Sequence, residues 1–145
     1  MAILTLSTAA HIADTALSTG NTHGFAPLAV VVLDLGGHIL VVKRNERASL
    51  YRADIATAKA KGCLGMGMGG RALAARAAKM PALYAAFNIV TEGVIPVAGG
   101  VLIRDKAGHT IGAVGISGDT ADNDERCAVV GIEVAGCVAD TGSAE

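Results

Sequence analysis

Hydrophobic residues recur along the chain with two different spacings. Between Ser7 and Leu17 the apolar side chains fall every three or four positions, which predicts an amphipathic helix capped by Ser7 or Thr8. The glycines at 20 and 24 are expected to end it. Unbroken β-branched runs such as residues 28–33 predict strands covered on both faces. The same patterns predict further helices over 50–64 (capped by Ser49), 71–79, 81–90 and 122–138, and further strands over 39–42, 100–104 and 110–116.

The turns between these strands are short and rich in glycine. Residues 34–37 (DLGG) separate the first two strands, and residues 105–108 (DKAG) separate the last two. Strands joined by such tight turns run antiparallel. The order of elements therefore predicts an α+β fold, in which helices cover an antiparallel sheet, and argues against a doubly wound parallel sheet. With 145 residues and no internal repeat, the chain is expected to form one domain, 1–145.

Composition narrows the class of function. Hydrophobic residues make up 52% of the chain and charged residues 17%, and 12 Lys and Arg against 13 Asp and Glu give a net charge of −1. This balance argues against a disordered chain, and against a nucleic-acid partner because neutralising phosphates needs a basic surplus. The 19 glycines and the many alanines indicate apolar surface, which favours a homo-oligomer.

The sequence also suggests a cellular location. It begins without a basic segment ahead of an apolar one, so no secretory signal is expected, and no uncharged apolar run reaches the roughly 18 residues that a membrane span needs. Cys63, Cys127 and Cys137 are odd in number and far apart, which favours reduced thiols over a disulfide framework. We therefore expect a cytoplasmic protein with no membrane contact.

Several motifs in a fixed order carry a family resemblance. They are residues 32–40 (VLDLGGHIL), 59–60 (KA), 95–103 (IPVAGGVLI), 112–118 (GAVGISG) and 124–128 (DERCA). Together they resemble the GlcG/HbpS-like family, which includes the C-terminal domain of PduO-type proteins, over the chain from about the first helix to Gly136. The resemblance implies a profilin-like antiparallel sheet of about five strands flanked by helices. It also implies a homo-oligomer, an octamer in some members.

The resemblance further implies a small-molecule ligand, with haem or a related tetrapyrrole first among the candidates. Other members of the family lie in catabolic gene clusters. A neutral imidazole can ligate iron, so His11, His23 and His38 are candidate cofactor-binding residues. His109 lies at the tip of the second hairpin, where we expect it to be solvated.

Glycines at the entrance of the strand over 100–104 are a second candidate part of a ligand site. Gly99 and Gly100 would let a ligand touch backbone that side chains otherwise block, although a bulge or turn explains them as well. Members of the family often carry Gly-Gly-x-Pro-Ile here, whereas this chain has Leu102 in place of the proline, which would change the rim of a pocket. Cys63 with Met66 and Met68 would suit copper(I), but no histidine or second cysteine is near in sequence, so no metal site is expected.

A dense polar cluster supports an alternative function, a cofactor-independent catabolic enzyme of lyase or isomerase type. Arg44 could clamp the carboxylate of a small carboxylate or aromatic metabolite with a two-pronged contact. Tyr51 and Asp54 could handle a proton, and Lys59 could act as a base if burial lowered its proton affinity. Exposed ion pairs explain the same residues without catalysis. A purely structural assembly subunit is the third alternative.

Overall fold

The computed structural model describes residues 2–144. The helices are α1 (Leu6–Thr22), α2 (Arg52–Met66), α3 (Gly70–Lys79), α4 (Pro81–Val90) and α5 (Ala121–Val134). The strands are β1 (Ala29–Asp34), β2 (Ile39–Arg44), β3 (Gly100–Arg104), β4 (Thr110–Ser117) and β5 (Val138–Asp140).

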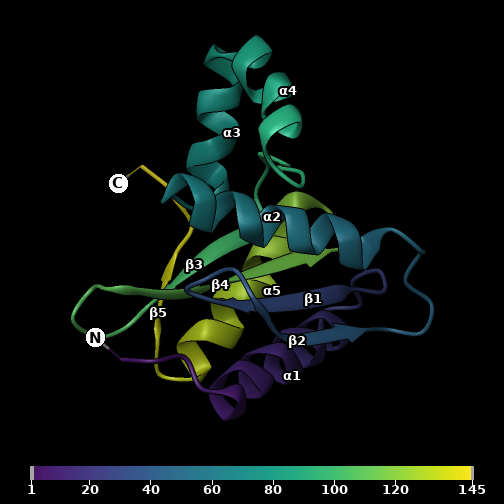
Figure 1. Cartoon of the computed structure of the whole chain (residues 1–145). Helices are drawn as coiled ribbons and strands as arrows, with labels where there is room; N and C mark the ends of the chain where they lie inside the picture. The colour runs from purple at the N-terminus through teal and green to yellow at the C-terminus, as the bar shows by residue number, and fades with distance from the viewer. Residues whose placement is uncertain (1, 145) are drawn as a thin grey trace.

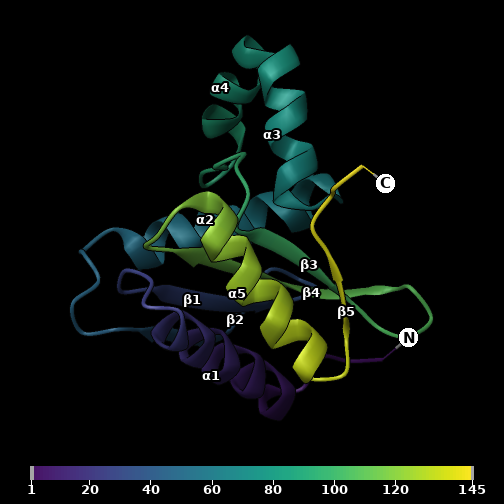
Figure 2. The ribbon, with the colours of Figure 1, turned by 180° about the vertical axis from the view of Figure 1, so that it is seen from behind.

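The strands form one antiparallel sheet in the order β2-β1-β4-β3-β5. This arrangement confirms the expected α+β fold, an antiparallel sheet of five strands flanked by helices. Figures 1 and 2 show α2 on one face of the sheet and α1 with α5 on the other. β1 lies inside the sheet, where Val31 pairs with both Val42 of β2 and Gly115 of β4.

The two faces of the sheet bury separate hydrophobic cores. Val30 and Val32 belong to the core under α1 and α5, together with Ile12. Val31 and Leu33 belong to the core under α2. Because successive side chains of a strand point to opposite faces, a strand between two cores must be apolar throughout, which explains the unbroken run in β1.

The predicted ends of α1 were wrong. The helix begins after Thr5, whose hydroxyl accepts a hydrogen bond from the Thr8 backbone N–H, rather than after Ser7 or Thr8. It also continues through Gly20. There the missing side chain allows close packing, since a Cβ at Gly20 would lie 2.7 Å from Cδ1 of Leu28.

The predicted ends of α2 and α5 also differ from the structure. Tyr51 rather than Ser49 precedes α2, and Gly67, with a φ of 71°, ends it beyond the expected residue 64. α5 stops at Val134 because Gly136 takes a φ of +84°. The residues that follow pair with β3 as the short edge strand β5, where the sequence pattern predicted helix to residue 138.

Helices α3 and α4 form a hairpin that stands out from the sheet and from α2 (Figure 1). We call residues 70–90 the arm. Its inner seam contains Leu73 of α3 and Tyr84 of α4, both buried, and the rings of Tyr84 and Phe87 pack 4.6 Å apart. The outer side of the arm is exposed along most of its length.

Candidate functional site

A groove of about 470 Å³ runs between α1 and α5. The two helices approach closely because Gly131 of α5 lies against the backbone of Ile12, where a Cβ would be 2.6 Å from the Ile12 carbonyl oxygen. The groove brings together two of the predicted histidines, His11 and His23, with Arg126 of α5. Its lining residues other than Val130 are polar, among them Asp14 and the α1 hydroxyls of Thr15, Ser18, Thr19 and Thr22, but carbon atoms form most of its surface.

His23 is held in place at one end of this groove. Its Nδ1 lies 2.8 Å from the Thr19 carbonyl oxygen, and its Nε2 lies 3.0 Å from Nη2 of Arg126. Arginine can only donate, so Nε2 accepts and Nδ1 carries the proton. The ring also stacks on Phe25 at 5.3 Å. In this state both ring nitrogens of His23 are engaged.

His11 lines the same groove from the exposed side of α1, near its N-terminal end. Among residues 2–144 no hydrogen bond involves its side chain. Both ring nitrogens are therefore open to a ligand from solvent. His23 directly follows α1, twelve residues after His11, which corresponds to roughly 18 Å at 1.5 Å per helical residue, so the two histidines cannot hold one metal ion together.

The other two histidines lie on hairpin turns. His38 follows the β1–β2 turn with its side chain 82% exposed, and its Nδ1 is 3.4 Å from Oδ1 of Asp34. It borders a second groove of about 550 Å³, which Lys61 and Leu64 of α2 also line. His109 lies at the β3–β4 turn with Nδ1 3.3 Å from Oδ2 of Asp105. Neither shares the α1–α5 groove.

Lys59 is buried at the end of β4. Its Nζ donates to the carbonyl oxygen of Ile116 at 2.8 Å and to Oδ2 of Asp124 at 3.2 Å. The other carboxylate oxygen of Asp124 accepts the backbone N–H of Asp119 at 3.0 Å. Burial raises the pKa of Asp124, and the Lys59 charge opposes this rise only in part. Lys59 thus joins α2 to the start of α5.

The glycine pair at the start of β3 faces α2. Gly99 has a φ of +108°, and a Cβ there would lie 2.8 Å from Nζ of Lys59. A Cβ at Gly100 would lie 2.7 Å from both Sγ of Cys63 and the Lys59 carbonyl oxygen. The absence of side chains therefore lets β3 pack directly under α2. A ligand would reach these glycines only after Lys59 moved, and their part in ligand binding stays a prediction.

The structure does not bring the four candidate catalytic residues together. Arg44 donates to the carbonyl oxygens of residues 45, 46 and 48, so its guanidinium binds the backbone of the loop that directly follows it. Tyr51 and Asp54 are exposed, whereas Lys59 points into the protein. Arg52, a member of the same polar cluster for which the sequence predicted no role, donates to the buried Ser117 hydroxyl at 3.2 Å. A catalytic role for this set stays a prediction.

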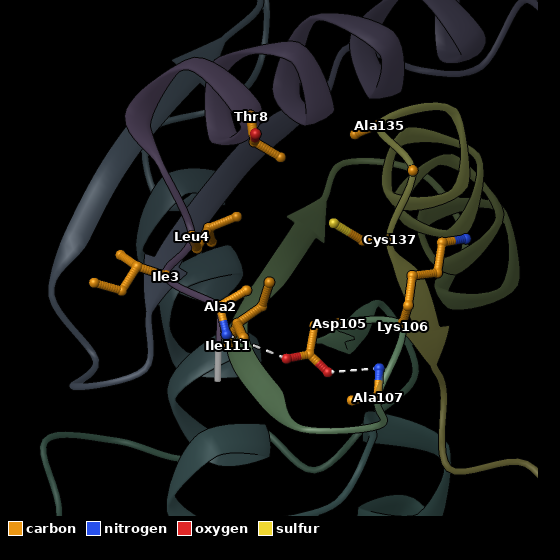
Figure 3. A pocket seen from close by; sticks show the side chains of 11 residues that line it. Ala2, Ile3, Leu4, Thr8, Asp105, Lys106, Ala107, Ile111, Ala135 and Cys137 are labelled. Atoms are coloured by element: carbon orange, nitrogen blue, oxygen red, sulfur yellow. Dashed lines mark hydrogen bonds between the residues drawn. The ribbon is translucent and has the colours of Figure 1, made fainter.

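The three cysteines are free thiols. Burial raises the pKa of Cys63 to about 12 and that of Cys127 to about 11, so both are protonated at neutral pH and bind metals weakly. Cys137 is half-buried and lines a third hollow of about 430 Å³ near the N-terminal segment (Figure 3). There the carboxylate of Asp105 accepts the N–H groups of Ala2 and Ala107.

Within residues 2–144, every helix is too short or too polar to span a bilayer. No group of three or more His, Cys, Asp or Glu side chains there converges as a metal site would require.

Sequence reasoning missed Arg126, which completes the α1–α5 groove. Arg126 lies within the 124–128 motif, so the sequence pointed to this segment without indicating the role of Arg126. Its partnership with His23 spans 103 positions of sequence and depends on how α5 crosses α1. Local spacing along the chain cannot reveal such a contact.

The fold and the groove define an α+β protein whose helix pair presents histidine and arginine beside a five-stranded antiparallel sheet. The model of one family, described as haem degrading protein HbpS-like, matches residues 4–133. This chain belongs to the HbpS-like family. No protein of curated function matches it in sequence.

Solved structures of similar proteins agree with this assignment. A double mutant of HbpS from Streptomyces reticuli is 28% identical with a TM-score of 0.80, over 92% of this chain and 88% of that chain. Protein ORFY from Klebsiella pneumoniae is 25% identical with a TM-score of 0.80, over 94% and 93%. The PduOC:Heme complex is 22% identical with a TM-score of 0.85, over 98% and 100%, and at this identity it shows the shared fold alone.

Proposed function

We propose that this chain binds haem or a related tetrapyrrole in the groove between α1 and α5, with His11 as the axial ligand. One observation carries the proposal. The His11 imidazole, which has no hydrogen-bond partner among residues 2–144, shares a single groove with the guanidinium of Arg126.

The chemistry of these two groups suits the iron and the propionates of a haem. A neutral imidazole nitrogen is a common axial ligand of haem iron. Arginine pairs with carboxylates through parallel hydrogen bonds, so Arg126 suits a propionate. Val130 adds an apolar side chain to the lining of the groove. Bound haem would supply a redox-active iron, while the residues of the groove would hold and orient it.

The family supports the same ligand. Its description refers to haem degradation, and one solved structure of the same fold is a haem complex. His23 is the second candidate ligand. If a propionate bound Arg126 in its place, Nε2 of His23 would lose its present partner and become free to bind iron. His38 is the third, in the separate groove beside Lys61.

Haemin titration of the purified chain tests the proposal. We expect a Soret band that His11→Ala abolishes and that His23→Ala and His38→Ala retain. His109→Ala is the matched control, since His109 is also an exposed histidine beside an aspartate on a hairpin turn. A flat titration of the wild-type chain would overturn haem binding. Loss of the band in His38→Ala but not in His11→Ala would overturn the choice of groove.

The same proposal includes a homo-oligomer, which could reach an octamer, in the cytoplasm. Exposed large apolar side chains support self-association, since water disfavours such surface. The α1–α5 groove is open, so a second copy could also cover its ligand. The three free thiols fit a reducing compartment.

A further inference from the structure

A cavity of about 250 Å³ lies between helix α2 and the end of α4 with the segment that follows it, residues 90–94. Two glycines of α2 make room for it. Gly62 and Gly65 are three residues apart, so they lie on the same side of the helix, and both line the cavity. A Cβ at Gly65 would meet no atom within 4 Å, and one at Gly62 would lie 3.0 Å from Cγ1 of Val94. The backbone of α2 is therefore exposed to this space.

The side chains around these glycines are apolar. They come from Met66 of α2, from Phe87 and Val90 of α4, and from Val94. An empty space much larger than a water molecule costs stability, because the atoms that line it lose packing contacts. Water is a poor occupant, since apolar cavities stay dry and take up apolar molecules instead. The lining therefore fits a small apolar group.

The size of the cavity and its lining favour an aromatic ring. A cavity of about 150 Å³ takes up benzene, so this larger one has room for a ring with a short substituent. The Phe87 ring can pack edge-to-face on a bound ring, and the Met66 thioether makes favourable contacts with ring edges. Pockets for drug-sized ligands measure roughly 300–1,000 Å³, so a molecule as large as haem does not fit.

One ion pair lies at the rim of the cavity. Nζ of Lys61 donates to the carboxylate of Glu92, and both residues line the cavity. Together with Gly65 they also line the groove beside His38. The ion pair therefore borders an apolar space and a groove with a more polar lining. A ligand with an apolar body and a charged head would meet both environments at this point.

Lys61 is the group that can take a new partner. The side chain of Glu92 is 82% exposed, and exposed ion pairs contribute little to stability, so a ligand carboxylate can replace Glu92 at small cost. Lys61 itself is only 35% exposed, which shields a carboxylate beside it from water and strengthens the attraction. The Thr91 hydroxyl is already engaged, since it donates to the Phe87 carbonyl oxygen and accepts the Gly93 N–H. Among the described residues that line the cavity, Lys61 is the one cation.

We propose that this cavity binds a small aromatic monocarboxylate, with the ring between α2 and α4 and the carboxylate on Nζ of Lys61 in place of Glu92. Burial of the ring removes apolar surface from water, and the charge-assisted hydrogen bond fixes the orientation of the ligand. The site goes beyond the proposed function. Haem binding is independent of it, because α2 and the α1–α5 groove lie on opposite faces of the sheet (Figures 1 and 2).

Methionine methyl NMR on the full chain, titrated with phenylacetate, tests the proposal. Met66 lines the cavity, whereas Met80 lies at the turn between α3 and α4. We expect the Met66 methyl resonance to shift with a Kd of about 1 mM or tighter, the range for a ligand of about ten heavy atoms, while Met80 stays unchanged. Phenylacetamide lacks the charge and acetate lacks the ring, so each should bind at least about 10-fold more weakly.

Variants of the ion pair should change the affinity in opposite directions. Lys61→Gln removes the cation and should weaken phenylacetate binding at least about 10-fold. Glu92→Gln removes the competing carboxylate and should strengthen binding about 3-fold. Gly65→Phe fills the cavity and should abolish binding. Its matched control is Gly65→Ala, which adds one carbon where no atom lies within 4 Å and should bind like the wild type.

The proposal is wrong if the Met66 resonance of the wild type does not shift, if Lys61→Gln binds phenylacetate as tightly as the wild type, or if a folded Gly65→Phe still binds it. The two ion-pair variants change partly exposed side chains, so they judge the charge contact even where Gly65→Phe fails to fold. The titration contains no haem. Its failure therefore leaves haem binding standing, and a flat haemin titration leaves this site standing.

Discussion

Lys59 and Asp124 form an ion pair in the interior, with 3.2 Å between Nζ and Oδ2 and with side chains only 5% and 2% exposed. The pair ties α2 to the start of α5 at the end of β4, where Lys59 also donates to the Ile116 carbonyl. Two charges withdrawn from water in this way depend on each other. Removal of one leaves the other buried without compensation.

We expect Lys59→Met to lower the free energy of unfolding by about 3–5 kcal/mol at neutral pH. The exposed Lys43–Asp14 pair provides the control, and Lys43→Met should cost less than about 1 kcal/mol. Urea unfolding followed by circular dichroism measures both. Equal losses in the two variants would show that the buried pair contributes no more than a surface one.

The loss in Lys59→Met should shrink as the pH falls. Burial already raises the pKa of Asp124 above its ordinary value of 3.8, and removal of the Lys59 charge raises it further. A carboxyl group with a raised pKa in the folded state binds its proton more tightly when folded, so its protonation favours folding. Unfolding measured from pH 7 down toward pH 4 should bring the variant closer to the wild type. A gap that widens on acidification would contradict this assignment.

Two glycines should respond to alanine in opposite directions. At Gly115 a Cβ would lie 1.8 Å from the Ala56 carbonyl oxygen, so Gly115→Ala must push α2 off β4 and should cost at least about 3 kcal/mol. At Gly65, within α2, a Cβ meets nothing within 4 Å, and Gly65→Ala should stabilise by about 0.5–1 kcal/mol. Thermal unfolding would reveal both shifts. A tolerated alanine at 115 would mean that the helix and the strand are not in backbone contact.

Only Cys137 should react with a thiol reagent in the folded protein. Burial raises the pKa of all three thiols, to about 12 for Cys63 and about 11 for Cys127, but Cys137 is only half-buried whereas the other two are fully buried. Maleimide labelling followed by peptide mass spectrometry should place the first modification at Cys137. The other two should label after unfolding in urea. Rapid native labelling of Cys63 would indicate that α2 opens from the sheet.

Tyr84→Phe should not weaken the single chain. The Tyr84 hydroxyl has no partner among residues 2–144, so its removal relieves a buried polar group and should leave the free energy of unfolding unchanged or raise it by about 1 kcal/mol. Tyr51→Phe at an exposed site is the control. A loss above about 1 kcal/mol in Tyr84→Phe, measured under conditions that keep the chain monomeric, would mean that the hydroxyl has a partner after all.

Much of the fold could be predicted from local pattern. Tight glycine turns specify antiparallel neighbours, and the β-branched run in β1 specifies burial on both faces. The errors concern residues whose role depends on distant packing. Gly20 stays helical because Leu28 packs against it, and the three residues of β5 become a strand only because β3 offers an edge.

The candidate sites could be predicted less well. The sequence identified two residues of the α1–α5 groove, His11 and His23. It could not place Arg126 there, because Arg126 reaches the groove from α5 through tertiary packing. Among the polar residues of α2, Lys59 points into the protein while Asp54 points to solvent. Asp54 and Lys59 are five residues apart, and five residues rotate a helix by about 140° beyond one full turn. The two side chains therefore lie on different faces although they are close in sequence.

The contact between Gly115 and Ala56 also determines which parts of the molecule can move. With peptide groups of α2 and β4 touching directly, no flexible side chains lie between them to absorb a slide or a rotation. α2 and the sheet must therefore shift together as one unit.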